Sequence, residues 1–391
     1  MEKKTVYLDN SATTMISEEA LAAYNEASLT CFGNPSSLHT MGANAEKMQR
    51  RAREILLSSL GASGYRAIFT ASGSEANNLA IIGRALSKER YKRGAKIITT
   101  NGEHASVNSP LEHLEKMGFK VAKISTTGGR IDLEELKREI TPDTILVTVM
   151  MVNNETGALY DVKAVSDLMK RQAPDALLHV DATQSFMKIP FTVRSVGADM
   201  ITVSSHKIHG PKGVGALVAS ESVFTKKALS PIVFGGGQEY GLRSGTENAP
   251  GIAAFGKAIE KELLPLKENE RKMRELRSYL IEKIKSCPIL SEISITDPPV
   301  SAPHILSLTL PKIKSETMLH YLSSENIFVS SGSACSSNSQ HKTSALVAYG
   351  RSESEADSSI RISFSHDNER EDVDLLCDAL RAGIARLARM R

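Results

Sequence analysis

The sequence has no long hydrophobic run and no excess of charge of one sign. No window holds the roughly 18 consecutive apolar residues that a membrane-spanning helix needs. The first residues, MEKKTVYLDNSATT, lack the apolar stretch of a signal peptide. Its 48 basic residues stand against 45 acidic ones, and the resulting charge of +3 is too small for a typical nucleic-acid-binding protein. These absences predict a soluble protein that binds neither membrane nor nucleic acid.

Closely spaced cysteines are also absent. The four cysteines, Cys31, Cys287, Cys335 and Cys377, are far apart and form no CxxC pair. This spacing indicates neither a zinc site nor a disulfide framework. We therefore predict no metal site, and reduced thiols in a cytoplasmic protein.

The chain is long enough for about two to three domains. It has 391 residues, of which 41% are apolar, an ordinary fraction for a globular protein with a sizeable core. Between Ala67 and Ser220, short β-type runs alternate with helical patterns. The candidate strands are AIFT, KIITT, FKVAKIS, TILVTVMMV, LLHVD, DMITVSS and VGALVAS.

Several of these runs are continuously apolar, as strands buried on both faces require. Helical spacing appears between them, for instance in Val162, Val165 and Leu168. The alternation predicts a three-layer α/β domain with a mostly parallel central sheet. After Pro250 a long charged helical stretch and short strands predict a second, smaller α/β domain.

The stretch ITVSSHKIHGPKG sets Lys207 at the end of an apolar run. A lysine is almost never fully buried unless it is paired or chemically used, because burial disfavours its charged form. Burial also produces a neutral, nucleophilic amine. Taken alone, the stretch favours a surface loop with Lys207 in solvent. The residues at the other strand ends therefore determine whether Lys207 is exposed or belongs to a site.

Ligands of open α/β sheets bind beyond the carboxyl ends of the strands. After AIFT, Gly73 and Ser74 begin a helix that presents backbone N–H groups to a phosphate, or that is only well capped. His104 follows KIITT, although a lone histidine is usually structural. After LLHV, Asp181 closes a buried strand, and a carboxylate there needs a cationic partner.

One ligand satisfies all of these groups. Pyridoxal 5′-phosphate (PLP) offers an aldehyde to a lysine, a pyridine nitrogen to a carboxylate, a ring face to an imidazole and a phosphate to a Gly–Ser turn. Separate structural explanations require several independent coincidences. The sequence therefore predicts PLP as the cofactor.

These segments resemble the cysteine desulfurase family, in particular its group I members within the class V aminotransferase superfamily. The matching segments run along nearly the whole chain: YLDNSATT, FTASGSEANNLAI, EHASV, VNNETG, HVDATQS, SSHKIHGPKGVGAL, GGGQEYGLRSGTENAPGI, SSGSACSS and SSIRISFS. The resemblance implies the fold of type I PLP-dependent transferases. It also implies a large cofactor domain over 16–255, a small domain formed by 1–15 and 256–391, and a homodimer with sites at the interface.

The resemblance implies catalytic roles for four residues. Lys207 resembles the lysine that bonds to the cofactor, Asp181 the partner of the pyridine nitrogen, and His104 the histidine that stacks on the ring and helps to move protons. Cys335 resembles the cysteine that accepts sulfur. Arg361, in SIRIS, resembles the arginine that binds the substrate carboxylate in bidentate geometry.

The remaining contacts that the resemblance implies are to the cofactor and the substrate. Asn154 and Gln184 resemble the contacts to the ring oxygen, and Asn154 also borders the substrate. Thr246 resembles a threonine that reaches the phosphate of the neighbouring subunit. The other implied cofactor contacts are Gly73, Ser74, Ser204, Ser205 and His206.

Cys335 lies among serine, glycine and asparagine in VSSGSACSSNS. Without the resemblance, such a cysteine reads as an exposed thiol on a loop. The loop from about 330 to 343 has few apolar anchors, so we expect it to move. Five residues of extended chain span at most roughly 17 Å, which lets one sulfur visit a buried cofactor and then an acceptor protein.

The predicted reaction converts L-cysteine to L-alanine. Substrate displaces Lys207 from the cofactor, the freed amine removes the α-proton, and the Cys335 thiolate attacks the substrate sulfur. The resulting persulfide passes to an acceptor. The sequence does not identify this acceptor as an iron–sulfur scaffold, a tRNA-thiolation protein or another carrier.

Other functions are weaker interpretations. GIAAFGKA, residues 251–258, matches a phosphate-binding P-loop except where Ala258 replaces the hydroxyl residue, and no strand precedes it. A selenocysteine lyase uses similar residues, so the sequence separates it poorly from a desulfurase. An aminotransferase has no use for Cys335, and a non-catalytic PLP-binding regulator has no need of the full catalytic set.

Overall fold

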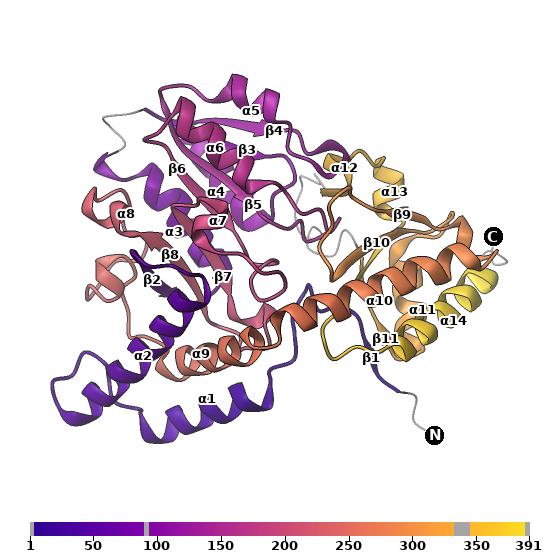
Figure 1. Ribbon diagram of the computed structural model, residues 1–391, viewed down its shortest axis with the longest axis horizontal. Helices are drawn as coiled ribbons and strands as arrows, with labels where there is room; N and C mark the ends of the chain where they lie inside the picture. The colour runs from indigo at the N-terminus through magenta and orange to yellow at the C-terminus, as the bar shows by residue number, and fades with distance from the viewer. Residues whose placement is uncertain (1–3, 90–93, 332–344, 388–391) are drawn as a thin grey trace.

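The computed structural model describes residues 4–89, 94–331 and 345–387. Two hydrophobic cores lie side by side, each built around its own sheet (Figure 1). We call the part around the larger sheet the first core and the part around the smaller sheet the second core. Among the helices that the structure describes, none combines the length and the apolar character that crossing a bilayer requires.

The first core contains a seven-stranded sheet with the order β2-β8-β7-β6-β5-β3-β4. Its strands are β2 (Tyr65–Thr70), β3 (Lys96–Thr100), β4 (Lys120–Ile124), β5 (Thr144–Met150), β6 (Leu177–Asp181), β7 (Met200–Ser204) and β8 (Gly215–Ser220). β8 pairs antiparallel with both of its neighbours, and the other pairs are parallel. The predicted mostly parallel sheet is confirmed, and all seven candidate strands belong to it.

Both faces of this sheet are covered, which explains the continuously apolar strands. Ile97 contributes to the cluster on one face and its neighbour Ile98 to the cluster on the other. The helices on the Ile97 face are α3 (Gly73–Ala85), α4 (Ala105–Lys116) and α8 (Glu221–Thr225). The helices on the Ile98 face are α1 (Glu18–Thr30), α2 (Thr40–Ser59), α5 (Leu133–Glu139), α6 (Val162–Gln172), α7 (Val193–Val196) and α9 (Ala249–Leu263).

The second core contains an antiparallel sheet with the order β12-β13-β10-β9. Its strands are β9 (Ser294–Thr296), β10 (Ile305–Thr309), β12 (Ser330–Ser331) and β13 (Ser359–Ser363). The helices that pack here are α10 (Leu266–Ser286), α11 (Ser315–Ser324) and α14 (Arg370–Leu387). β1 (Val6–Tyr7) pairs in parallel with β11 (Ile327–Phe328), so the start of the chain also joins this core.

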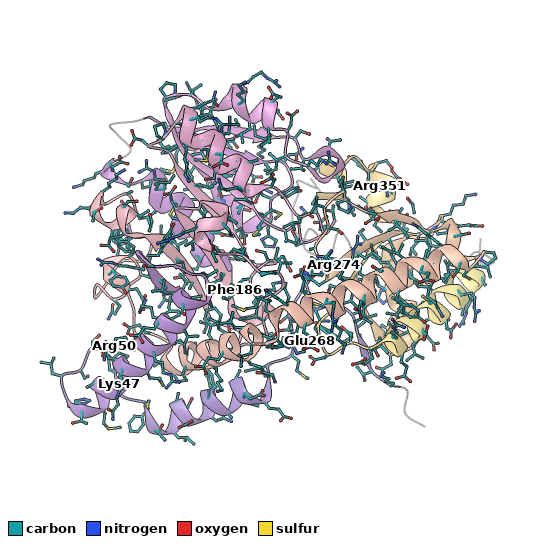
Figure 2. The ribbon with its side chains drawn as sticks, in the orientation of Figure 1. Lys47, Arg50, Phe186, Glu268, Arg274 and Arg351 are labelled. Carbon is teal, nitrogen blue, oxygen red and sulfur yellow. The ribbon has the colours of Figure 1, made fainter. Side chains whose placement is uncertain are left out.

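The long α10 has an exposed face as well as a buried one. Glu268 and Arg274 project from it, whereas Phe186 is enclosed in the first core (Figure 2). Shorter helical elements fill the connections: α12 (Ala345–Tyr349), α13 (Glu353–Asp357), η2 (Thr127–Gly129), η3 (Ser205–Lys207), η4 (Glu239–Gly241) and η5 (Leu290–Glu292). Residues 251–258, which partly match a P-loop, lie inside α9, so they form no phosphate-binding loop.

Residues 9–17 connect the two cores. Asp9 forms a bridge with Ser363 at the end of β13. Further along, the backbone N–H groups of Thr14 and Ser17 donate to the carbonyl oxygens of His206 and His209. This crossing brings the N-terminal segment to the turn that carries Lys207. The domain limits at 15/16 and 255/256 stay a prediction.

Candidate active site

A cavity of about 270 Å³ lies at the carboxyl ends of the central parallel strands. Ten of the predicted site residues line it: Gly73, Ser74, His104, Asn154, Asp181, Gln184, Ser204, His206, Lys207 and Arg361. A larger hollow of about 560 Å³ lies between α1, α2 and α9, but no predicted site residue lines it. Of these two cavities, the one with the predicted site residues is thus the one at the carboxyl ends of the strands, where ligands of open α/β sheets bind.

Asp181 ends β6 and is almost completely buried, with 6% of its surface exposed. Two hydrogen bonds hold its carboxylate. Asn77 Nδ2 donates to Oδ2 at 2.8 Å, and the backbone N–H of Thr183 donates to Oδ1 at 2.9 Å. These two donors hold the carboxylate oxygens of Asp181 at defined positions. Asp181 is therefore fixed in place and able to pair with a cation in the cavity.

His104 is held by the start of α4, where it is the N-cap residue. Its Nδ1 accepts a hydrogen bond from the backbone N–H of Ser106 at 3.1 Å. Because Nδ1 is an acceptor, the neutral ring carries its proton on Nε2. Burial lowers the pKa of His104; Asp181 opposes this shift, while Lys207 and Arg361 add to it. The ring is therefore neutral near pH 7.

Asn77, on α3, links these two side chains. One amide hydrogen goes to Asp181, and the same Nδ2 donates to Ser106 Oγ at 2.8 Å. Ser106 Oγ in turn lies 2.9 Å from His104 Nδ1. The sequence interpretation missed Asn77 and Ser106, because a polar residue inside a helix shows no pattern that reveals a bond to the opposite wall. Ser106 lines the cavity, whereas Asn77 is not among its lining residues; the other unpredicted lining residues are Ser11, Ala12, Ser72, Met150, Val152 and Thr183.

Glu103 lies directly before His104 and is buried beneath the site. Its Oε1 accepts hydrogen bonds from Thr100 Oγ1 at 2.6 Å and from the backbone N–H of Met150 at 3.0 Å. Burial, with repulsion from Asp181, raises the pKa of Glu103 to about 8 despite these bonds. The carboxyl group is therefore protonated at neutral pH, and it adds no second negative charge beside Asp181.

Lys207 lies in η3, the turn that follows β7, and is half-buried at the cavity wall rather than free in solvent. Its Nζ donates to the carbonyl oxygens of Ser11 at 2.5 Å and Ala12 at 2.7 Å. Gln184 Nε2 donates to the same Ser11 oxygen at 2.9 Å. Residues 9–17, which cross between the two cores, therefore position both Lys207 and Gln184.

The start of α3 faces the end of β7 across the cavity. Ser72 caps the helix by accepting the N–H of Glu75, and Gly73 and Ser74 form its first turn. A Cβ atom at Gly73 would lie 3.2 Å from both Ser204 Cβ and Thr183 Oγ1, so glycine permits the close approach. Ser204 Oγ is buried and has no hydrogen-bond partner among the residues that the structure describes. The N–H groups at the start of α3 and the hydroxyl of Ser204 are all hydrogen-bond donors, so together they suit an anion.

Next to this wall, His206 Nδ1 lies 3.2 Å from Thr13 Oγ1. Burial, together with the positive charges of Lys207 and Lys212, lowers the pKa of His206 to about 4. At neutral pH the His206 ring is therefore uncharged.

Arg361 enters the cavity from β13 of the second core, and only 6% of its surface is exposed. Its Nη1 donates to the backbone oxygen of Asn154, and its Nη2 to Asp9 Oδ1, both at 2.9 Å. Within the described part of the chain, Arg361 Nε has no hydrogen-bond partner although it is buried. The guanidinium is thus oriented by two cores and retains a donor for a ligand.

Three predicted residues are not among those that line the cavity. Cys335 lies outside the described residues, but β12, just before it, pairs with β13 through Ser330 and Arg361. The described part of the chain therefore ends, before Cys335, beside Arg361. Thr246 is exposed and lines a separate hollow of about 100 Å³. Ser205 is buried in the turn η3, against Gly210.

Comparisons with known proteins define the class first. Residues 6–376 match the model of the aminotransferase class-V family. The chain therefore belongs to this family, whose members are generally PLP-dependent. It is also 37% identical over 385 residues to the cysteine desulfurase IscS 1 of Archaeoglobus fulgidus, with 98% of both chains covered. Within the class-V family, the chain thus belongs to the cysteine desulfurase family.

Solved structures agree with this assignment. A NifS-like protein superposes with a TM-score of 0.89 at 34% identity, covering 98% of this chain and all of the other. The protein SspA, solved in complex with cysteine, superposes with a TM-score of 0.78 at 31% identity over 92% of this chain and 99% of its own. These matches confirm the predicted fold of type I PLP-dependent transferases.

Proposed function

We propose that this protein is a PLP-dependent cysteine desulfurase that converts L-cysteine to L-alanine and holds the sulfur as a persulfide on Cys335. One observation carries the proposal: Lys207, Asp181 and Arg361 reach a single cavity although they come from distant parts of the chain. An amine, a carboxylate and a guanidinium suit an aldehyde, a pyridine nitrogen and a substrate carboxylate, respectively.

The residues present fit PLP. The phosphate would be held by the start of α3 and by Ser204, whose buried hydroxyl lacks a partner in the described chain. Asp181 would pair with the pyridine nitrogen, and Gln184 and Asn154 would border the ring oxygen. When bound, PLP supplies an electron sink for the carbanion that forms at the substrate α-carbon.

Lys207 and His104 are the groups that would move protons. The two carbonyl oxygens of Ser11 and Ala12 keep the Lys207 amine at the cavity wall, within reach of a bound substrate. His104 presents a protonated Nε2 because its Nδ1 is occupied by the N–H of Ser106. In its neutral form His104 can therefore donate a hydrogen bond while Lys207 takes the α-proton.

Arg361 would bind the carboxylate of L-cysteine. Its unpaired Nε and its Nη2, now shared with Asp9, form one edge of the guanidinium, the geometry that carboxylates prefer. Binding there fixes the amino acid at one end. The thiolate of Cys335, carried by the chain that continues from β12, would then attack the substrate sulfur. As the S–S bond of the persulfide forms, the Cβ–S bond of the substrate would break; its electron pair would stay with the carbon skeleton, and a proton taken up at Cβ would complete alanine.

Partners and compartment are part of the same proposal. The position of Thr246 among the lining residues of a separate hollow supports a homodimer in which this residue serves the neighbouring subunit. Free thiols at Cys31, Cys287 and Cys377 support a reducing cytoplasm. The sulfur acceptor would be a protein of iron–sulfur cluster, thio-cofactor or tRNA-thiolation biosynthesis.

A pair of cysteine variants tests the proposal. Cys335→Ser should retain the visible absorption of bound PLP but form neither alanine nor sulfide from L-cysteine, because a serine hydroxyl cannot accept the sulfur. Cys31→Ser, the matched control, should behave like the unmodified enzyme. Wild-type rates in Cys335→Ser would contradict the persulfide route. Turnover of selenocysteine but not cysteine by the wild type would favour a selenocysteine lyase.

A further inference from the structure

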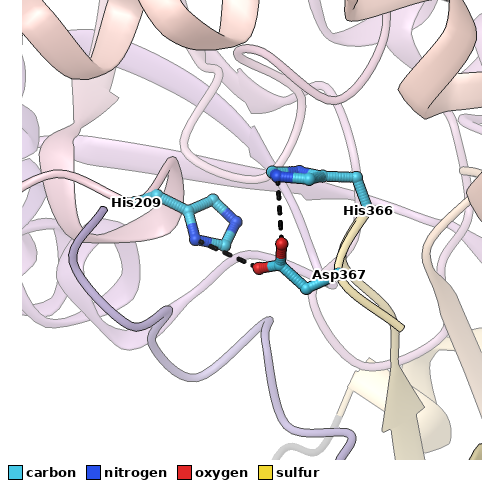
Figure 3. Close-up of side chains that lie close together, drawn as sticks. All are labelled: His209, His366 and Asp367. Carbon is cyan, nitrogen blue, oxygen red and sulfur yellow. Dashed lines mark ion pairs between the residues drawn. The ribbon is translucent and has the colours of Figure 1, made fainter. Parts of the chain in front are cut away.

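A second group of reactive side chains lies where the two cores meet, outside the cavity described above. His209 follows the turn that carries Lys207, and His366 and Asp367 follow β13. Their rings and carboxylate converge, with the two ring centroids 4.8 Å apart (Figure 3). One ligand atom from each of the three residues lies within 4.8 Å of the others. Neither the proposed reaction nor the cofactor uses this cluster.

His209 is 4% exposed, and its two nitrogens differ. Nδ1 lies 3.0 Å from the carbonyl oxygen of Met15, so Nδ1 carries the proton that this acceptor requires. Nε2 then has a lone pair, and it is buried without a hydrogen-bond partner among the described residues. The ion pair drawn in Figure 3 joins Asp367 Oδ2 to Nδ1 of His209, 3.9 Å away, so the Asp367 carboxylate would have to turn toward Nε2 to share an ion with it. A buried, unpartnered acceptor costs about 1–3 kcal/mol, so it requires an explanation.

His366 is held in a complementary way. Its Nδ1 lies 3.4 Å from Oε2 of the buried Glu262, and its Nε2 lies 3.3 Å from Asp367 Oδ1. Metal-binding histidines usually donate one ring N–H to a carboxylate or a backbone carbonyl and bind the ion through the other nitrogen. Glu262 would serve His366 in this way, and Met15 would serve His209.

We propose that His209, His366 and Asp367 form a binding site for a divalent transition-metal ion such as Zn²⁺. Imidazole nitrogen and carboxylate oxygen are both zinc ligands, and water would complete a tetrahedral set. Ligand atoms around tetrahedral zinc are about 3.3 Å apart. The cluster must therefore contract by about 1.5 Å at its widest separation, and the 61% exposed side chain of Asp367 is free to move.

The surrounding charges permit a cation here. Glu262 and Asp367 face the cluster, as does the buried Lys188; burial raises the pKa of Glu262 to about 7 and lowers the pKa of Lys188, so it disfavours the charge on both groups. Two further lysines nearby, Lys261 and Lys272, are paired with Glu19 and Glu369. An ion would join the segment that follows Lys207 to the segment that follows Arg361. Binding would therefore couple the two cores on either side of the active site.

Cobalt titration of the PLP-loaded enzyme, with accessible thiols alkylated, tests the site. We expect one Co²⁺ per chain with the visible absorption of a tetrahedral nitrogen–oxygen site, and displacement by Zn²⁺. Asp367→Asn, at an exposed position, should weaken cobalt binding at least tenfold, and so should His366→Gln. Glu262→Gln should weaken it about 10- to 100-fold through the lost support of His366. His320→Gln, on the exposed face of α11, should leave it unchanged.

Absence of a tetrahedral spectrum at saturating Co²⁺ in the wild type would overturn the proposal. Wild-type cobalt affinity in both Asp367→Asn and His366→Gln would overturn it as well. Thermal melting provides a second readout, because a ligand that binds only the folded state raises the melting temperature as its concentration increases. The melting temperature of the wild type should rise with Zn²⁺, and that of Asp367→Asn should not.

Discussion

At the scale of single residues, the site depends on side chains that hold the predicted site residues in place. Asn77 donates to Asp181 and to Ser106, and Ser106 approaches His104. One amide thus orients both the proposed partner of the pyridine nitrogen and the ring that would stack on the cofactor. Because hydrogen bonds to charged groups contribute about 1.5–3 kcal/mol, the loss of this amide should be measurable.

Asn77→Ala should lower kcat about 10- to 100-fold, since Asp181 loses a donor and Ser106 loses its orientation. Steady-state kinetics of alanine formation checks this, together with the absorption of the bound cofactor. Asn78→Ala is the matched control, because Asn78 donates to the backbone oxygen of Ser74 and does not touch Asp181. Equal rates for the two variants would contradict the orienting role of Asn77.

Glu103 makes stability depend on pH. Its folded pKa of about 8 lies above the ordinary value of 4.5, so the folded state binds more protons than the unfolded state between these values. The stabilisation is fully present below pH 4.5 and is lost as the pH rises through 8. At ~1.4 kcal/mol per pKa unit, the loss amounts to a few kcal/mol.

Glu103→Gln should therefore flatten the fall in unfolding free energy between pH 5.5 and pH 8.5. Urea denaturation of the PLP-loaded enzyme at both pH values measures this difference. Glu134→Gln, at an exposed position on α5, should keep the wild-type fall. If Glu103→Gln loses as much stability as the wild type over this range, the carboxyl group is not protonated in the folded protein.

At the scale of elements, the phosphate side of the site is formed by two ends that meet. The start of α3 supplies N–H groups, and the end of β7 supplies Ser204. The hydroxyl of Ser204 bonds to no other described residue, so it adds nothing to the folded protein through a protein hydrogen bond. Its contribution should appear only when an anion is bound.

Ser204→Ala should leave the melting temperature of the cofactor-free protein unchanged or slightly raised, and should weaken PLP binding about tenfold. Equilibrium dialysis and thermal melting measure the two effects. Ser166→Ala is the control, because it removes a buried hydroxyl bonded to the Gly197 carbonyl. This variant should have a lower melting temperature in the cofactor-free protein and an unchanged affinity for PLP. Unchanged PLP affinity in Ser204→Ala would place the phosphate elsewhere.

At the scale of the whole molecule, the sequence patterns predicted the large sheet well. All seven candidate runs are strands of the sheet, and the pattern is clearest for the central strands β5, β6 and β7, which are buried along their whole length. Asp181 and Lys207 were then expected to lie in one site, because neighbouring parallel strands end at the same edge of the sheet and ligands bind there. The resemblance implied that Ser205 contacts the cofactor, but Ser205 is buried in η3 and is not among the residues that line the cavity.

The remaining contacts could not be read from the chain. Ser11 reaches Lys207 only because residues 9–17 cross between the cores, and no local pattern reveals a crossing. The same holds for His209 and His366, which lie on segments far apart in sequence. The absence of closely spaced cysteines predicted no metal site, but it carries no information about histidines that come together in the fold.

The most direct test of the central claim is the mass of the intact enzyme before and after exposure to L-cysteine without reductant, followed by peptide mapping. We expect a gain of one sulfur atom on the peptide that contains Cys335, reversed by reductant. No sulfur gain in an enzyme that carries its cofactor on Lys207 would contradict the desulfurase assignment.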